Sequence, residues 1–277
     1  MSDTTRPRLT VALTFDHDAI AAEVLRGDDP SRISRGEYGP RVGVPRILEL
    51  LERRGIAATW FVPAHTARTF PESVAAIVAA GHELGCHGWA HEDLATLEPE
   101  AERRILEDSR AAIARAYGRS PLGFRAPYWS LSPRTLQMVE ALGFAYDSSL
   151  MADDLHLYRV RHGDRHAPQG SVLGQEGRLV EVPISWLLDD WPQFEPGRSG
   201  IGPLAEPSKV LEIWTEELRW AHAHVQDGVL TVTMHPEAIG RGSRLTMLER
   251  FIDLAGGLEG VVFERLDRVV ERWSAAG

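Results

Sequence analysis

Two groups of polar residues in this chain have the types and spacing of a hydrolytic metal site. His87 and His91 stand four positions apart, and Asp16 and Asp18 follow the apolar run that begins at Leu9. Zinc in proteins is commonly held by imidazole nitrogens and carboxylate oxygens, and a catalytic zinc keeps one position open for water. One carboxylate can then bind the metal while its neighbour accepts a proton from the metal-bound water.

The local pattern supports this division of labour. If the apolar run is a strand that continues to Asp18, alternation puts Asp16 and Asp18 on one side and His17 on the other. Each motif alone has an ordinary explanation, since histidines at this spacing are common on amphipathic helices and aspartates often end strands. Both motifs follow β-like runs, and their joint occurrence therefore favours a metal site.

Composition restricts the class of protein. With 40 acidic and 30 basic residues the net charge is −10, which argues against nucleic acid or an anionic membrane surface as a partner. The polar opening and the short apolar run after it suggest neither a secretory signal nor a transmembrane span. Cys86 is the only cysteine, so no internal disulfide is possible and a reducing cytoplasm is expected. We expect Cys86 to be a small core residue rather than a ligand.

The chain alternates short β-like runs with helix-length segments, the pattern of an α/β protein with a mainly parallel sheet. Seven or eight such units indicate a (β/α) barrel. We expect one domain over residues 1–277, with long surface loops at 27–43, 148–178 and 186–207. Strands are predicted at 9–15, 57–62, 82–86, 122–126, 144–146, 179–184, 229–233 and 261–264. Helices are predicted at 45–54, 71–80, 98–117, 132–142, 209–225, 245–254 and 265–273.

The polar candidates all lie at predicted strand ends. Because active groups of (β/α) barrels gather at the C-terminal ends of the strands, these side chains are expected to face one mouth. They are Asp16 and Asp18 after the first strand, His87 and His91 after the third, then Arg125, Asp147 and His235.

These residues carry a resemblance to the polysaccharide deacetylase family, also called the NodB-homology or carbohydrate esterase family 4 group. Thr14-Phe15-Asp16-His17-Asp18 resembles its first motif, His87-Gly88-Trp89-Ala90-His91 its second, Arg125-Ala126-Pro127-Tyr128 its third and Val232-Thr233-Met234-His235 its last. The resemblance implies a distorted (β/α) barrel, usually of seven strands, and metal-dependent hydrolysis of an N-acyl amide. It assigns Asp18, His87 and His91 to the metal, Asp16 as general base held by Arg125, and His235 as the acid that protonates the leaving nitrogen.

Two departures from the family pattern bear on function. His17 separates the two aspartates, which are adjacent in the best-known members. This spacing, together with Trp186-Leu187-Leu188-Asp189-Asp190-Trp191, is similar to a branch that is often intracellular and includes peptidoglycan deacetylases and hydrolases of cyclic imides or ureides. The family's aspartate that orients the acidic histidine is only partly matched by Asp147.

The substrate remains open between two classes. An N-acetylated sugar or small N-acyl compound fits the family, whereas a cyclic imide or ureide fits the cytoplasm and the aspartate spacing. The long loops are expected to close over a small ligand, in a pocket lined by aromatic residues. These are Trp89, Tyr128, Trp129, Trp186 and Trp191.

Other aspects of the chemistry stay open as well. Zinc is the first choice of metal, and manganese, cobalt, nickel or iron fit the same ligands. Two alternative interpretations are a non-catalytic binding protein and a metal-free hydrolase. The presence of both a candidate base and a candidate acid argues against the first. The resemblance also favours a homo-oligomer, with a tetramer as the expected form.

Overall fold

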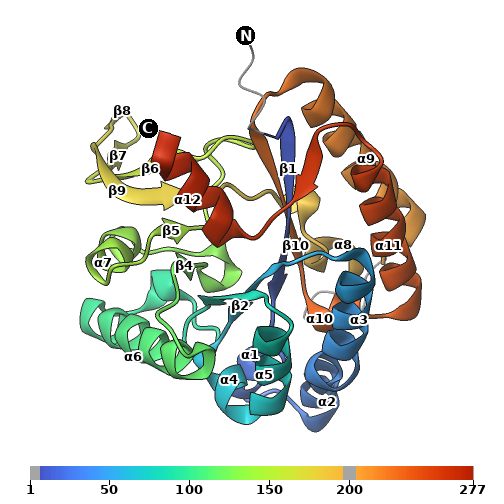
Figure 1. Cartoon of the computed structure of the whole chain (residues 1–277). Helices are drawn as coiled ribbons and strands as arrows, with labels where there is room; N and C mark the ends of the chain where they lie inside the picture. Colours follow the sequence, from blue (N-terminus) through green and yellow to red (C-terminus); the bar gives the residue numbers. More distant parts are fainter. Residues whose placement is uncertain (1–6, 196–203, 277) are drawn as a thin grey trace.

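The computed structural model describes residues 7–195 and 204–276. A curled sheet with the order β10-β1-β2-β3-β4-β5-β9-β6 forms its centre, and β11 pairs with the start of β1. Every pairing along this path is parallel except that of β6 with β9. Helices surround the sheet (Figure 1). The prediction of a distorted (β/α) barrel is thus confirmed.

The strands are β1 (Leu9–Asp16), β2 (Thr59–Val62), β3 (Glu83–Cys86), β4 (Gly123–Phe124), β5 (Tyr146–Asp147), β6 (Tyr158–His162), β7 (Arg165–Ala167), β8 (Gly170–Val172), β9 (Gln175–Glu181), β10 (Gly228–Met234) and β11 (Val261–Phe263). The helices are α1 (Ala21–Arg26), α2 (Pro30–Tyr38), α3 (Val44–Arg54), α4 (Ala64–Thr69), α5 (Pro71–Ala79), α6 (Pro99–Tyr117), α7 (Thr135–Ala141), α8 (Trp191–Phe194), α9 (Pro207–His224), α10 (Pro236–Ile239), α11 (Gly242–Gly256) and α12 (Leu266–Ala276). Short turns of other helix types are η1 (Gly39–Gly43), η2 (Leu94–Thr96), η3 (Pro127–Trp129) and η4 (Trp186–Leu188).

The barrel is distorted because its two edges join only loosely. Beyond β9, the segment that contains Asp189 forms an isolated parallel bridge to Thr233 of β10. This bridge draws the chain after β9 toward the end of β10. Residues from both edges of the sheet therefore meet at one mouth.

Alternation along β1 decides which side chains reach the barrel interior. Leu9, Val11 and Leu13 belong to the large apolar core, while Ala12 belongs to a smaller cluster with Phe61 and other residues. Side chains of a strand point alternately to opposite faces. Asp16 therefore lies on the same face as Ala12, toward the interior, at the end of a fully buried strand.

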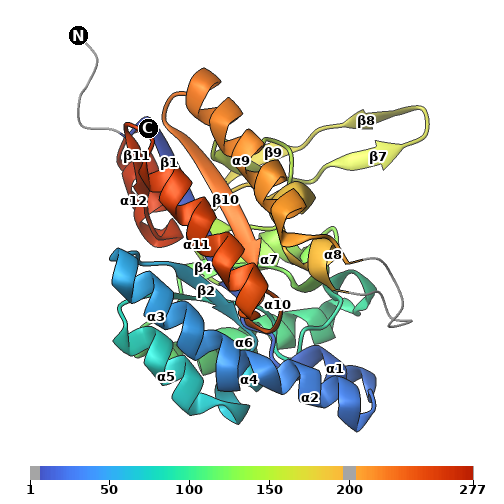
Figure 2. The ribbon, with the colours of Figure 1, turned by 90° about the vertical axis from the view of Figure 1, so that its right-hand side faces the viewer.

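The smaller cluster includes Leu266, Val269 and Val270 of α12, so this helix packs against the interior side chains. In Figure 1 α12 lies in front of the sheet, and Figure 2 shows α9 and α11 side by side outside β10. Cys86 is buried in the large core, as predicted. Among the described residues no helix is both long enough and apolar enough to cross a bilayer.

The predicted loop at 27–43 is wrong. Asp29 caps α2 by accepting hydrogen bonds from the backbone N–H groups of Ser31 (2.9 Å) and Arg32 (3.3 Å), and Pro30 occupies the first turn. A cap residue followed by proline is a strong helix start. The polar composition of the segment hid this start, because Gly36 is the one buried residue of the helix and no apolar stripe marks its inner face.

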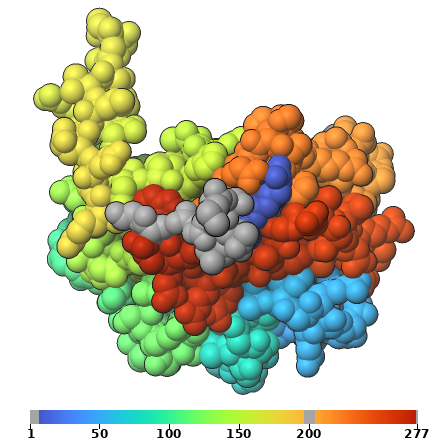
Figure 3. Space-filling view, turned by 45° about the horizontal axis from the view of Figure 1, so that its top comes forward, coloured from blue at the N-terminus to red at the C-terminus, as the bar shows by residue number. Residues whose placement is uncertain are grey.

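The predicted surface excursion at 148–178 contains β6, β7, β8 and the beginning of β9. β7 and β8 form a two-stranded arm that stands out from the body (Figures 2 and 3). The third predicted loop holds η4 and α8, and its residues 196–203 lie outside the described residues. The first strand ends at Asp16 rather than at Asp18.

Candidate metal-centred active site

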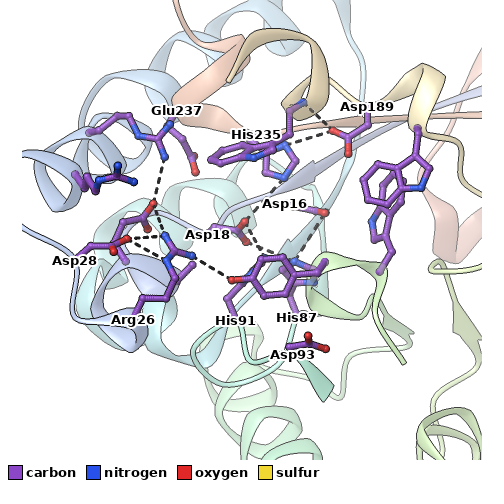
Figure 4. A pocket seen from close by; sticks show the side chains of 18 residues that line it. Asp16, Asp18, Arg26, Asp28, His87, His91, Asp93, Asp189, His235 and Glu237 are labelled. Carbon is purple, nitrogen blue, oxygen red and sulfur yellow. Dashed lines mark hydrogen bonds and ion pairs between the residues drawn. The ribbon is translucent and has the colours of Figure 1, made fainter. Parts of the chain in front are cut away.

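Asp18, His87 and His91 converge although they come from different segments. Asp18 follows β1, and the two histidines lie in the turn after β3. Oδ1 of Asp18 lies 3.5 Å from Nε2 of His87, and Oδ2 lies 3.2 Å from Nε2 of His91. Two atoms bound about 2.1 Å from one tetrahedral zinc lie about 3.4 Å apart. The spacing of these three side chains therefore fits a shared cation (Figure 4).

The hydrogen bonds of the triad also fit a cation. Nδ1 of His87 lies 2.7 Å from the carbonyl oxygen of Arg125, which can only accept, so Nδ1 carries the proton and Nε2 offers its lone pair. Burial lowers the pKa of His87 and favours the neutral ring that a metal ligand requires. Oδ1 of Asp18 is buried and has no hydrogen-bond partner in the described structure. A divalent ion would supply the missing partner.

The turn that presents the histidines is tightly constrained. Gly88 has a φ of +71°, and a Cβ added there would meet Cγ of Pro127 at 3.1 Å. His91 itself has a φ of +65°, a conformation that non-glycine residues adopt only when their surroundings enforce it. Glu92 helps to enforce it, because its carboxylate accepts hydrogen bonds from the backbone N–H groups of Trp89 (3.0 Å) and Ala90 (2.9 Å).

Asp16 lies beside the triad and is held from below. Nη1 of Arg125 donates to its Oδ1 at 2.8 Å and also to Oγ1 of Thr14 at 2.9 Å. Arg125 is fully buried and is fixed by Ser148, whose carbonyl oxygen and Oγ each accept a hydrogen bond at 2.9 Å. The other oxygen of Asp16 lies 3.8 Å from Nε2 of His87. Asp16 thus presents one free oxygen toward the place where a metal-bound water would sit.

His235 stands on another side of the same centre. Its Nε2 lies 3.9 Å from Oδ2 of Asp18, and its Nδ1 lies 2.8 Å from Oδ1 of Asp190. Burial alone would lower the pKa of His235, but the hydrogen bond and charge of Asp190 raise it well above the ordinary value. This pairing favours the protonated ring, with Nε2 directed to the pocket (Figure 4).

Asp190, not Asp147, is the carboxylate that orients His235. Asp147 instead accepts a hydrogen bond from Oγ of Ser149 at 2.8 Å and pairs with buried Glu181. The sequence around Asp190 was already part of the resemblance, but the contact joins residues 45 positions apart, across the bridge from the β9 edge to β10. The contact between Asp190 and His235 could therefore be found only from the closed barrel and not from the sequence.

His17 is directed away from the site, as alternation predicted. Its Nε2 is hydrogen-bonded to Oγ of Ser73 at 3.0 Å, and burial lowers its pKa to about 4. The chain between Asp16 and Asp18 therefore alternates even though the strand itself has ended.

The triad lies at the bottom of a cavity of about 710 Å³. One wall is aromatic: Trp129 and Trp186 pack with ring centroids 4.1 Å apart, and Tyr128 lies against His91 at 4.3 Å. Trp191 contacts the ring of His235 at 4.8 Å. Trp89 is absent from this lining; its ring instead lies under the guanidinium group of Arg68.

The opposite wall is polar and was not predicted from the sequence. It consists of charged residues of α1, α2 and α10 that line the cavity, namely Glu23, Arg26, Arg32, Arg35 and Glu237. Arg26 donates to the hydroxyl of Tyr128 at 3.1 Å and so joins the two walls. Arg32 and Arg35 were overlooked because the segment at 27–43 was taken for a loop, and no predicted element or motif included Glu23, Arg26 or Glu237.

Comparison with known proteins gives the family. The sequence profile described as polysaccharide deacetylase matches residues 3–146, which is 144 of the 277 residues. The chain belongs to the polysaccharide deacetylase family. The match ends before Asp190 and His235, so their pairing comes from the structure alone.

Full-length similarity extends beyond this profile. The chain is 33% identical to a peptidoglycan deacetylase of Helicobacter pylori, over 95% of each chain. A Mycobacterium smegmatis protein assigned to the polysaccharide deacetylases is 35% identical and superposes with a TM-score of 0.87, covering 100% of this chain and 93% of that one. The PuuE allantoinase is 25% identical with a TM-score of 0.82, over 98% and 92% of the two chains. Membership of the deacetylase family identifies the chain as an amide C–N hydrolase.

Proposed function

We propose that this deacetylase-family enzyme is a metal-dependent hydrolase of amide C–N bonds outside peptides, with an N-acetylated amino sugar or another small N-acyl compound as substrate. The observation that supports it is the placement of Asp16 and His235 around one triad, 3.8 Å from His87 and 3.9 Å from Asp18. Hydrolysis of an amide needs a base for the attacking water and an acid for the leaving nitrogen.

Each residue of the site has one task in this proposal. Asp18, His87 and His91 would hold a divalent ion, with zinc the first choice, and such an ion lowers the pKa of its water and polarises the acyl oxygen. Asp16 accepts the proton of the attacking water while Arg125 fixes its orientation. His235 delivers a proton from Nε2 to the leaving nitrogen.

A second candidate function is the opening of a cyclic ureide or imide. The near full-length likeness to an allantoinase favours it, and so does a cavity with one polar wall, which suits a small ring better than a long polymer. The same base and acid would serve, because a ring carbonyl is attacked in the same way as an acetamide. The two candidates differ only in what is attached to the reacting carbonyl.

The setting of the enzyme is also a proposal. We infer a single domain in the cytoplasm, acting on small molecules and not on nucleic acid or membranes. The single cysteine and the net charge of −10 support this setting. A homo-oligomer, with a tetramer as the expected form, follows from the resemblance to the intracellular branch.

A substrate panel tests the proposal. N-acetylglucosamine oligomers, assayed for acetate release, are compared with hydantoin, dihydrouracil and allantoin, assayed for ring opening. Zinc-loaded and chelated enzyme are run side by side, with Asp16→Asn as the control for contaminating activity. Acetate release alone supports the first candidate and ring opening alone the second. Unchanged turnover by the chelated enzyme or by Asp16→Asn contradicts the assigned roles.

A further inference from the structure

Glu237 lies in the pocket but has no task in the reaction described above. It stands in α10, two residues after His235, and is 3% exposed. It lines the cavity, and Figure 4 shows its carboxyl group beside His235 on the polar wall. Its Oε2 is buried and has no hydrogen-bond partner in the described structure.

Glu23 presents a second oxygen of the same kind on this wall. It is 4% exposed, and its Oε1 lies 3.4 Å from Arg26 and 3.3 Å from Arg35. Its Oε2 is buried and without a partner. Two carboxyl groups from α1 and α10, far apart in the chain, therefore each present an unsatisfied acceptor beside one cavity.

Such acceptors destabilise a folded protein, because a buried oxygen without a partner has lost its hydrogen bonds to water and has gained none within the protein. Glu102 shows how this chain satisfies a carboxylate that serves structure. It is fully buried, and its oxygens accept from Ser132 at 2.7 and 2.8 Å, from Thr135, and from Arg134 at 3.2 Å. Glu237 lacks any such set of donors, so its burial is not explained by support of the fold.

We propose that Glu237, with Glu23 beside it, accepts hydrogen bonds from N–H or O–H groups of the substrate on the side of the leaving nitrogen. The proposal rests on the proposed function, because His235 marks that side by its role as acid. The χ3 angle of glutamate is broad, so the carboxyl group can turn either oxygen to the ligand. The site would then select amides whose leaving nitrogen carries a neighbouring donor, as ureides and amino sugars do.

Matched substrates test this selection. Hydantoin differs from succinimide, and dihydrouracil from glutarimide, by one N–H in place of a methylene group. N-acetylglucosamine is compared with the analogue that lacks the hydroxyl next to the acetamido carbon. We expect wild-type kcat/KM to favour the donor-bearing member by about 5- to 100-fold, the cost of leaving a buried acceptor without its partner. The class that reacts tells whether the donor is an N–H or an O–H group.

Substitution of Glu237 tests whether this side chain causes the preference for the donor-bearing substrate. In Glu237→Leu the ratio within a pair should fall to within about threefold of unity, while Glu237→Gln, which keeps an acceptor oxygen, retains part of it. An unchanged ratio in Glu237→Leu overturns the proposal. A ratio that falls equally in Glu237→Gln and Glu237→Leu also overturns it.

Thermal unfolding of the zinc-loaded enzyme gives a readout without turnover. Glu237→Leu removes an unsatisfied acceptor and should raise Tm by about 2 °C or more, whereas the control Glu102→Leu should lower it. If wild type hydrolyses neither member of any pair, the proposed function fails and Tm alone decides the inference. A rise then supports a carboxyl group kept for a ligand, and a fall as in Glu102→Leu overturns it.

Discussion

Replacing Arg125 by methionine tests how far the position of Asp16 depends on one buried cation. The guanidinium group is fully buried and donates hydrogen bonds to Asp16 at 2.8 Å, to Thr14 at 2.9 Å and twice to Ser148 at 2.9 Å. Methionine fills a similar volume but offers no donor. Asp16, which is 2% exposed, would then keep a buried charge without its counter-charge.

The expected magnitude follows from that geometry. Removing one partner of a buried ion pair costs about 3–5 kcal/mol, a large share of the 5–15 kcal/mol by which such domains are stable. We therefore expect Arg125→Met to lower the free energy of unfolding by about 3–5 kcal/mol. Asp16→Asn still offers an oxygen to Arg125, and its cost should be only about 1–3 kcal/mol. In the double variant neither charge is left unpaired, so a coupling energy of about 2 kcal/mol is expected.

Urea unfolding of the four proteins, followed by tryptophan fluorescence in the presence of zinc, measures this coupling. The m-values must agree for the free energies to be comparable. Arg103→Met, which removes an exposed ion pair with Glu100 and Glu107, is the control and should change the free energy of unfolding little. Strict additivity of Arg125→Met and Asp16→Asn would refute the reasoning, since it would mean that the two charges do not stabilise each other.

Three further outcomes are expected. Asp190→Asn removes the charge that raises the pKa of His235, so the alkaline limb of the pH profile of kcat/KM should shift to lower pH by about one to two units. An unchanged alkaline limb would exclude this pairing from catalysis. Burial, with the charge of Asp267, raises the pKa of Glu83 from 4.5 to about 7, so the free energy of unfolding of wild type should fall as pH rises between these values. Chemical unfolding at a series of pH values should show a smaller dependence of this free energy on pH for Glu83→Gln. Chelation should abolish turnover, and zinc at about 100 times its Kd should stabilise wild type by about 2.7 kcal/mol but not His91→Ala, as differential scanning fluorimetry can check.

Much of the site could be predicted from local patterns. Alternation at the end of β1 placed Asp16 and Asp18 together and His17 apart, because that rule depends only on neighbouring residues. The placing of His87 and Arg125 near them needed one more assumption, that consecutive parallel strands end at the same rim. The family motifs supplied that assumption, and the sheet order agrees with it.

The parts that could not be predicted depend on contacts between distant segments. Asp147 and Asp190 are both buried aspartates, Asp147 at the end of β5 and Asp190 between η4 and α8, and neither local sequence shows which of them meets His235. Asp190 reaches His235 only because the chain after β9 bridges to β10. Glu237 was missed for a related reason, since it belongs to a wall of the pocket that α10 forms together with α1 and α2, and the sequence analysis expected a loop at α2.

The true place of Asp147 explains how a single arginine can hold Asp16, the proposed general base. Burial raises the pKa of Asp147 to about 6, and burial with the charge of Asp147 raises the pKa of Glu181 well above its ordinary value. Two such carboxyl groups in contact share a proton near neutral pH and carry at most one negative charge. If both were ionised, they would compete with Asp16 for the charge of Arg125. The shared proton therefore leaves the guanidinium group to Asp16, and the Ser148–Ser149 turn, hydrogen-bonded to both carboxyl groups, fixes Arg125 from the far side.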